Sequence, residues 1–226
     1  MREVRWRQVV ARRLRRQFLA DPADDPVAVA GELCGVHAQV ASSAEQILGV
    51  RCVGATPQRV REHLWQHRTL VKTWGMRGTL HLFPAAELPL WVAAFSNRQW
   101  PKFTPAWERY HGVTPDELRA VTGAIGDVLP GRELTREELA AEVAARLHAP
   151  HLTERITSGW GVMLKPAAAG GLLCFAESRG RTVRFASPHD WLRGEWPHHD
   201  PDEAMRTVLL RFLDRYGPAS HEDVAR

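Results

Sequence analysis

The chain of 226 residues has few cysteines and no long apolar run. Cys34, Cys52 and Cys174 are scattered and form no C-x-x-C pair, so neither a disulfide framework nor a zinc knuckle is supported. The histidines lack the spacing of metal ligands. No apolar stretch approaches the ~20 residues that span a bilayer, and no apolar segment follows the arginine-rich start. We therefore expect a protein of the cytoplasm with no metal, no cofactor and no membrane contact.

Lysine is also scarce. The only lysines are Lys72, Lys102 and Lys165, although the formal net charge is +4 and the sequence pI is about 9.3. Arginine suits bidentate contacts to phosphate and guanine, but heavy use of arginine also follows from a GC-rich coding sequence. The composition therefore permits a nucleic-acid partner without demonstrating one.

The stretch Gly35–Gln46 stands out from the helical patterns around it. Over 36–40, apolar residues alternate with His37 and Gln39, which would place both polar side chains on one side of an extended segment. On a regular helix they would lie about 200° apart. The pattern predicts a short extended break between two helices, and a helix connector with merely solvated polar groups remains the alternative.

Capping patterns predict where the helices begin. Ser42 followed by Glu45 is typical of a capping box that would start the helix after the extended break. The same Thr-x-x-Glu pattern starts at Thr114 and at Thr135. A further helix is expected over 153–169, kinked or broken near a proline.

The order of expected elements repeats along the chain. Helices followed by a hairpin of two short strands at 70–83 form a winged-helix pattern, and the same order recurs over 114–185. A third copy begins with a helix over 202–216 and stops with the chain. We predict a mainly α fold with short β-hairpins, organised as tandem winged-helix domains. The first expected unit, 1–110, contains the H-x-Q motif. A second unit spans 111–198, and an incomplete third unit spans 199–226.

Two segments resemble a known family. H-A-Q at 37–39 and T-W-G-M-R-G-T-L-H-L at 73–82, in this order, are similar to the AlkZ/YcaQ class of winged-helix DNA glycosylases. The resemblance is continuous over residues 8–95 and rests on architecture over 112–226. It implies a bacterial, monofunctional, metal-independent hydrolase. The implied reaction cleaves the N-glycosidic bond of alkylated purines, namely bulky N7-alkylguanine adducts or crosslinks, in DNA repair or antibiotic self-resistance.

The resemblance also implies the catalytic pair. A Gln–apolar–Gln motif of that family falls on His37 and Gln39, with His in place of the first Gln. An N7-alkylated base carries a positive charge before it leaves, so it needs no strong general acid, and the remaining task is to place a water against the sugar carbon. Gln39 would orient this water, and His37 would take its proton or hold it in place. A carboxylate-based mechanism would use Glu45 instead, but the cap accounts for that residue.

The implied partner is double-stranded DNA that carries an alkylated purine, and we expect a monomer. Residues 2–19 predict an amphipathic helix with arginines along one face. Such a face is either solvated or in contact with phosphate. The residues expected to hold DNA, mostly at its phosphates, lie on this helix and on the hairpins: Arg12, Arg16, Lys72, Trp74, Arg77, Arg179 and Arg181.

Two other functions explain part of the pattern. A non-catalytic winged-helix regulator accounts for the hairpins and the arginines, but not for the paired His37 and Gln39 in a helix break. A protein-interaction module built of winged helices predicts no salt-dependent affinity for DNA.

Overall fold

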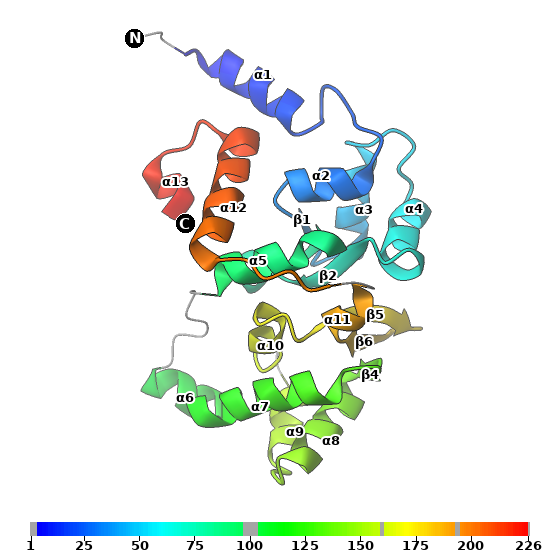
Figure 1. Cartoon of the computed structure of the whole chain (residues 1–226), viewed down its shortest axis with the longest axis vertical. Helices are drawn as coiled ribbons and strands as arrows, with labels where there is room; N and C mark the ends of the chain where they lie inside the picture. The colour runs from blue at the N-terminus through cyan, green and yellow to red at the C-terminus, as the bar shows by residue number, and fades with distance from the viewer. Residues whose placement is uncertain (1–3, 97–103, 159–160, 193–194, 226) are drawn as a thin grey trace.

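Each half of the chain folds around a three-stranded antiparallel sheet. The computed structural model describes residues 4–96, 104–158, 161–192 and 195–225. Figure 1 shows the first half above the second, with the last helices returning to pack beside the first half. The prediction of a mainly α fold with short hairpins is confirmed. None of the helices in the described ranges is long and apolar enough to cross a membrane.

The first sheet joins a hairpin to a short strand that precedes it by two helices. Its strand order is β1-β3-β2. The elements of this half are, in chain order, α2 (Pro26–Glu32), β1 (Val36–His37), α3 (Ala41–Gly49), α4 (Pro57–Arg61), the π-helical turn η1 (Glu62–Gln66), β2 (Leu70–Trp74), the 3₁₀ turn η2 (Met76–Gly78), β3 (Leu80–Pro84), a second 3₁₀ turn η3 (Ala85–Glu87) and α5 (Leu88–Phe95).

The second half repeats this order. A helix, a short strand, three helical segments and a hairpin follow each other again, and the strand order β4-β6-β5 corresponds to that of the first sheet. The elements of this half are α6 (Pro105–His111), α7 (Pro115–Val128), β4 (Leu134–Thr135), α8 (Arg136–Arg146), α9 (Leu152–Thr157), α10 (Lys165–Ala169), β5 (Cys174–Arg179), β6 (Thr182–Ala186) and α11 (Pro188–Trp191).

The short strands β1 and β4 add to what the sequence predicts. The two hairpins follow from local alternation and turn residues, whereas a two-residue strand has no periodicity of its own. Its partner in each sheet lies beyond three helical segments and the first strand of the hairpin. Buried hydrogen bonds then join the two halves: the indole of Trp191 donates to the Leu70 carbonyl at 3.1 Å, and the Thr73 hydroxyl donates to the Leu173 carbonyl at 3.2 Å.

Two of the three capping boxes are confirmed. Thr114 and Thr135 each accept a hydrogen bond from the backbone three residues later, and the glutamate there bonds back to the threonine backbone. The box at Ser42 is wrong, because α3 begins at Ala41 with Val40 as its N-cap. The segment 153–169, expected to be a helix kinked or broken near a proline, forms two separate helices, α9 and α10. Pro166 lies in the first turn of α10, where its missing N–H costs nothing, so it starts a helix rather than breaking one.

Helix α1 (Trp6–Arg16) docks in an unexpected orientation. Of its apolar residues, Val9 is buried, whereas Trp6 is 69% and Leu14 is 42% exposed. The contact is made with α12 (Pro201–Tyr216), which precedes α13 (His221–Ala225). Arg12 and Arg16 each lie 3.3 Å from the same Asp214 carboxylate oxygen. The arginine face therefore holds the helix to the molecule.

Replacing Asp214 tests this attachment. Asp214→Asn removes both ion pairs, and each partly exposed pair stabilises by about 0.2–1 kcal/mol. We expect amide hydrogen exchange in α1 to become roughly three- to tenfold faster, with the sheets unchanged. Asp202→Asn, on the same helix but outside this pair of contacts, is the control. Unchanged exchange in α1 would show that Val9 and its neighbours hold the helix without the arginines.

Candidate active site

The His-x-Gln segment is extended, as predicted. Val36 and Ala38 are 2% and 1% exposed, whereas His37 and Gln39 are both exposed. Gly35 makes this path possible. Its φ is +92°, and a Cβ at this position would lie 2.6 Å from the Phe83 ring. The chain therefore crosses close over Phe83 and presents both polar side chains to solvent, His37 from β1 and Gln39 from the residues just after it.

A second histidine lies directly beside His37. His81 on β3 is the cross-strand partner of His37, and their ring centroids are 5.5 Å apart at 87°, an edge-to-face contact. His81 is 7% exposed, and its Nδ1 lies 3.0 Å from the Thr79 carbonyl. Because a carbonyl only accepts, that nitrogen carries the hydrogen. This hydrogen bond fixes the orientation of the His81 ring, and the His81 ring in turn supports one side of the His37 ring.

Gln39 is held by the end of the same sheet. Its side-chain oxygen accepts from the Leu80 N–H at 3.4 Å, while the Ala38 N–H donates to the Leu80 carbonyl at 2.7 Å. The Gln39 side chain thereby continues the hydrogen-bond ladder by one step beyond β1. An amide oxygen accepts two hydrogen bonds, so this contact leaves capacity for a water.

Glu45 has a different role from the predicted cap. It is 9% exposed, and it accepts from the Arg61 Nε at 2.8 Å. The pair joins α3 to α4 beside a hollow that Ala38, Lys72 and Glu177 also line. The carboxylate is therefore a partner of Arg61.

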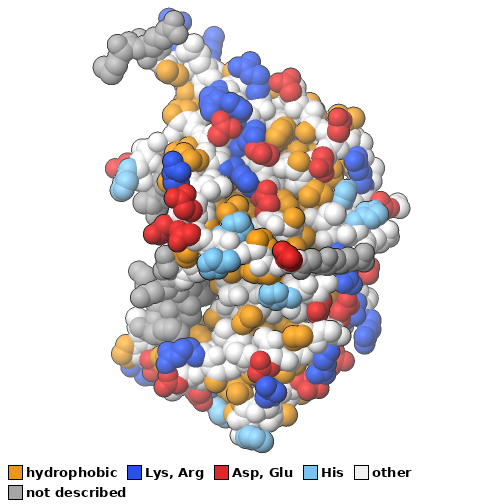
Figure 2. Space-filling view, viewed as in Figure 1, with side chains coloured by type: hydrophobic (Ala, Val, Ile, Leu, Met, Phe, Trp, Pro, Cys, Tyr) orange, Lys and Arg blue, Asp and Glu red, His pale blue; other side chains and the backbone are white. Residues whose placement is uncertain are grey.

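The residues predicted to hold DNA are dispersed over the molecule. Arg12 and Arg16 line a cleft between α1 and α12 together with Arg15 and Arg215. Figure 2 shows basic side chains gathered over this end of the molecule, with acidic ones among them. Four arginines face this cleft against two carboxylates: Asp214 pairs with three of them, and Glu32 pairs with Arg215, so the cleft keeps an excess of positive charge.

The first hairpin contributes less exposed charge than expected. Lys72 lies over the Phe175 ring at 5.3 Å, and burial lowers its pKa. Trp74 packs against Phe175 and Phe185, with ring centroids 4.9 and 6.2 Å apart. Its indole therefore fills the space between the two halves. The side chain of Arg77 lies outside the described part of the chain.

The second hairpin presents its arginines to solvent. Arg179 and Arg181 flank Gly180, whose φ of +62° forms the turn between β5 and β6, and both side chains are exposed. This is the placement that the sequence predicts. In the described ranges, no three His, Cys, Asp or Glu side chains are grouped so that they could hold a metal ion.

His81 is the site residue that sequence reasoning missed. It lies in the T-L-H-L segment, where alternation marks a strand but gives no role to the histidine. Its proximity to His37 depends on the pairing of β1 with β3, which no local pattern specifies. The sequence does show alternating polar residues in both strands, but this alternation does not identify which strands pair.

Comparison with known proteins gives consistent matches. A family model described as DNA glycosylase AlkZ-like matches residues 30–226. A Streptomyces sahachiroi protein named interstrand DNA cross-link repair glycosylase is 40% identical over 225 residues, which cover 98% of this chain and 60% of that protein. The solved structure of Streptomyces sahachiroi DNA glycosylase AlkZ matches with a TM-score of 0.89 at 37% identity, over 97% of this chain and 59% of that chain. The chain thus spans about three fifths of the length of these relatives.

Proposed function

The chain belongs to the AlkZ-like DNA glycosylase family, and from this premise we propose that it hydrolyses the N-glycosidic bond of alkylated purines in DNA. The proposed substrates are bulky N7-alkylguanine adducts or crosslinks, in line with the name of the cross-link repair relative. The observation that carries the proposal is the joint exposure of His37 and Gln39 on one extended segment. Both side chains can reach one water there.

The proposed reaction needs one water and one base. Alkylation at N7 makes guanine a cationic leaving group, so the bond to the sugar carbon breaks with its electron pair passing to the base. The water oxygen then bonds to the sugar carbon and loses a proton. Gln39 orients the water through its amide oxygen, and neutral His37 accepts the proton.

His81 acts as a positioning residue in this proposal. Its ring is fixed by the contact with the Thr79 carbonyl, and its edge-to-face contact with His37 restricts the rotamers of that side chain. A base must lie within about 3 Å of the proton that it removes. A buried support for an exposed imidazole therefore favours the geometry that the reaction needs.

We further propose that the enzyme is monofunctional and requires no metal. A lyase step would use an amine nucleophile close to the sugar carbon. Lys72 pairs with Leu82, the residue that follows His81 on β3. The Lys72 side chain therefore leaves the face of the sheet opposite to that of His37 and His81. The cationic leaving group removes the need for Lewis-acid assistance.

The repeated order of elements supports a tandem winged-helix architecture. Each half has a helix, a short strand, three helical segments and a hairpin, and Ser220 accepts from the Asp223 N–H at 3.2 Å where α13 begins. We propose units over 1–110 and 111–198, with 199–226 as the start of a third. Duplex DNA would contact the exposed wing arginines and the arginine cleft beside α1, mostly through phosphates.

Alanine substitutions test the catalytic pair. His37→Ala and Gln39→Ala should each slow release of an N7-alkylguanine by about 10²–10⁴-fold, since general-base assistance has that magnitude. The double variant should lose less than the product of the two effects, because both groups act on one water. Single-turnover release and DNA affinity are measured together, and affinity should stay nearly constant.

Glu45→Gln serves as the control for the carboxylate alternative. Glu45 binds Arg61, so this variant should retain the rate within a few-fold. If Glu45→Gln loses activity on the scale expected for His37→Ala, the Glu45 carboxylate acts as the base and the proposed role of His37 and Gln39 is wrong. If the wild type and both alanine variants release the base equally slowly, the chain is a DNA-binding protein without this activity.

Salt dependence tests the wing arginines. Affinity for duplex DNA should fall with salt at a log–log slope of about −0.9 for each phosphate contacted. Arg179→Ala combined with Arg181→Ala should make the slope shallower by roughly two such contacts. Arg146→Ala is the matched control, because that guanidinium is paired with Asp127 at 2.7 Å. Affinity that does not vary between low and physiological salt would rule out phosphate contacts altogether.

A further inference from the structure

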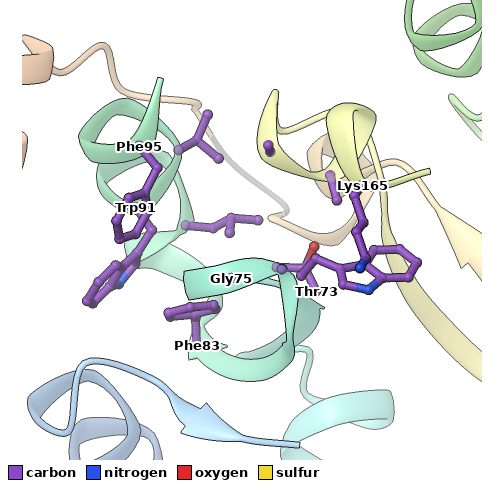
Figure 3. A pocket seen from close by; sticks show the side chains of 12 residues that line it. Thr73, Gly75, Phe83, Trp91, Phe95 and Lys165 are labelled. Atoms are coloured by element: carbon purple, nitrogen blue, oxygen red, sulfur yellow. The ribbon is translucent and has the colours of Figure 1, made fainter. Parts of the chain in front are cut away.

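The aromatic cavity beside the first sheet is closed off from the catalytic segment. It lies between the β2–β3 turn, α5 and α10, and Figure 3 shows Phe83 and Trp91 at its wall. Phe83 packs against Trp91 on one side, and on the other its ring centroid lies 5.8 Å from that of His81. These buried rings separate the cavity from His37. DNA at the catalytic pair therefore meets the exposed surface of the extended segment itself.

That surface ends on an apolar side chain. Val40 directly follows Gln39 and is 58% exposed. The alternation that buries Val36 and Ala38 would bury Val40 as well, but the chain bends at 39–40 to enter α3. The bend therefore leaves an isopropyl group in solvent, beside the residue proposed to orient the water.

Val40 also occupies a helix start that suits a polar residue. It is the N-cap of α3, with an extended backbone and no side-chain cap. Thr56, Thr114 and Thr135 hold the same position in α4, α7 and α8, and each accepts a hydrogen bond from the backbone N–H three residues later. Valine is among the weakest N-cap residues, because it has no side-chain acceptor. A broken local rule of this kind is expected at functional sites.

The place of Val40 in the chain limits what it can touch. Consecutive Cα atoms are about 3.8 Å apart, so the Cα of Val40 lies no more than about 11 Å from that of His37. One strand of duplex DNA rises about 3.4 Å per nucleotide. When the sugar carbon of the damaged nucleotide faces the water at Gln39, Val40 is therefore within reach of that nucleotide or its neighbour.

The lesion determines the side from which the sugar is approached. N7 of guanine faces the major groove, so a bulky group attached there obstructs that groove. The sugar carbon is then approached from the minor groove, which deoxyribose rings border. Proteins that bind in the minor groove use apolar side chains there. An exposed isopropyl group suits this surface, whereas a capping hydroxyl would keep its hydrogen bonds to the helix.

We propose that Val40 packs its isopropyl group against the deoxyribose next to the damaged nucleotide and so positions the reacting sugar carbon against the water at Gln39. The inference rests on the proposed function, since the damaged nucleotide is the one placed at Gln39. Val40 binds the substrate and moves no proton. Its methyl groups leave water when the complex forms, which favours the correctly placed strand.

Variants of Val40 separate this contact from the stability of α3. Val40→Thr keeps the shape and supplies a cap, so it should raise Tm by about 2–4 °C, yet slow release of N7-methylguanine from a duplex by about fourfold, because one methyl contact is lost. Val40→Ala loses both methyl groups and should slow release about fifteenfold. Val40→Ile should recover most of the rate lost in Val40→Ala. Single-turnover release is measured below saturation, after subtraction of spontaneous depurination, so that losses of affinity and of rate both count.

Val50 supplies the matched control. It is the C-cap residue of the same helix and is also 58% exposed. Val50→Thr and Val50→Ala should release N7-methylguanine at the wild-type rate. If the Val40 variants also release it at that rate, the contact is absent and the glycosylase proposal stands. Equal losses at both positions would likewise overturn the inference, because the effect would not be specific to the catalytic segment.

NMR of valine methyl groups tests the contact without turnover. The protein, labelled with carbon-13 in these methyls, is bound to a duplex that carries a tetrahydrofuran abasic-site analogue. Nuclear Overhauser effects to deoxyribose protons are expected from Val40, whose signals are assigned by their loss in Val40→Ile, and not from Val50. If these effects appear but the wild type releases no base, the contact stands and the glycosylase proposal fails. Their absence from the bound complex would overturn the inference.

Discussion

The pairing of β1 with β3 is the constraint on which the rest of the site depends. Two residues of extended chain place His37 against His81, and the next step of the ladder fixes Gln39 on the backbone of Leu80. A short strand has little stability alone, and it relies on the hairpin below it. Any change that weakens the hairpin therefore displaces both polar side chains together.

The same hairpin joins the site to the second half of the chain. β2, the first strand of this hairpin, is held by the Trp191–Leu70 hydrogen bond from α11 and by the Thr73–Leu173 hydrogen bond. Trp74 then fills the space against Phe175 and Phe185. The second half therefore supports the sheet that carries the proposed active site, in addition to presenting arginines on its own hairpin.

Local physics explains what the sequence alone could predict. Alternation identified the extended segment at 36–40, and threonine–glutamate boxes located α7 and α8, because these signals lie within a few residues of each other. Contacts between distant residues left no such signal. Arg12 and Asp214 are 202 residues apart, and a carboxylate near a helix start, such as Glu45, is read as a cap until Arg61 is placed beside it. Part of the catalytic hypothesis could therefore be predicted, namely His37 and Gln39, whereas the contact of His37 with His81 could not.

The most direct measurement is a crystal structure of the chain bound to duplex DNA with a cationic azasugar in place of the damaged nucleotide. This sugar mimics the charge that develops as the base departs. We expect a water between the Gln39 amide oxygen and the His37 ring, within about 3.2 Å of each, and facing the azasugar. An azasugar bound beyond the reach of both side chains, or against the Glu45 carboxylate, would contradict it.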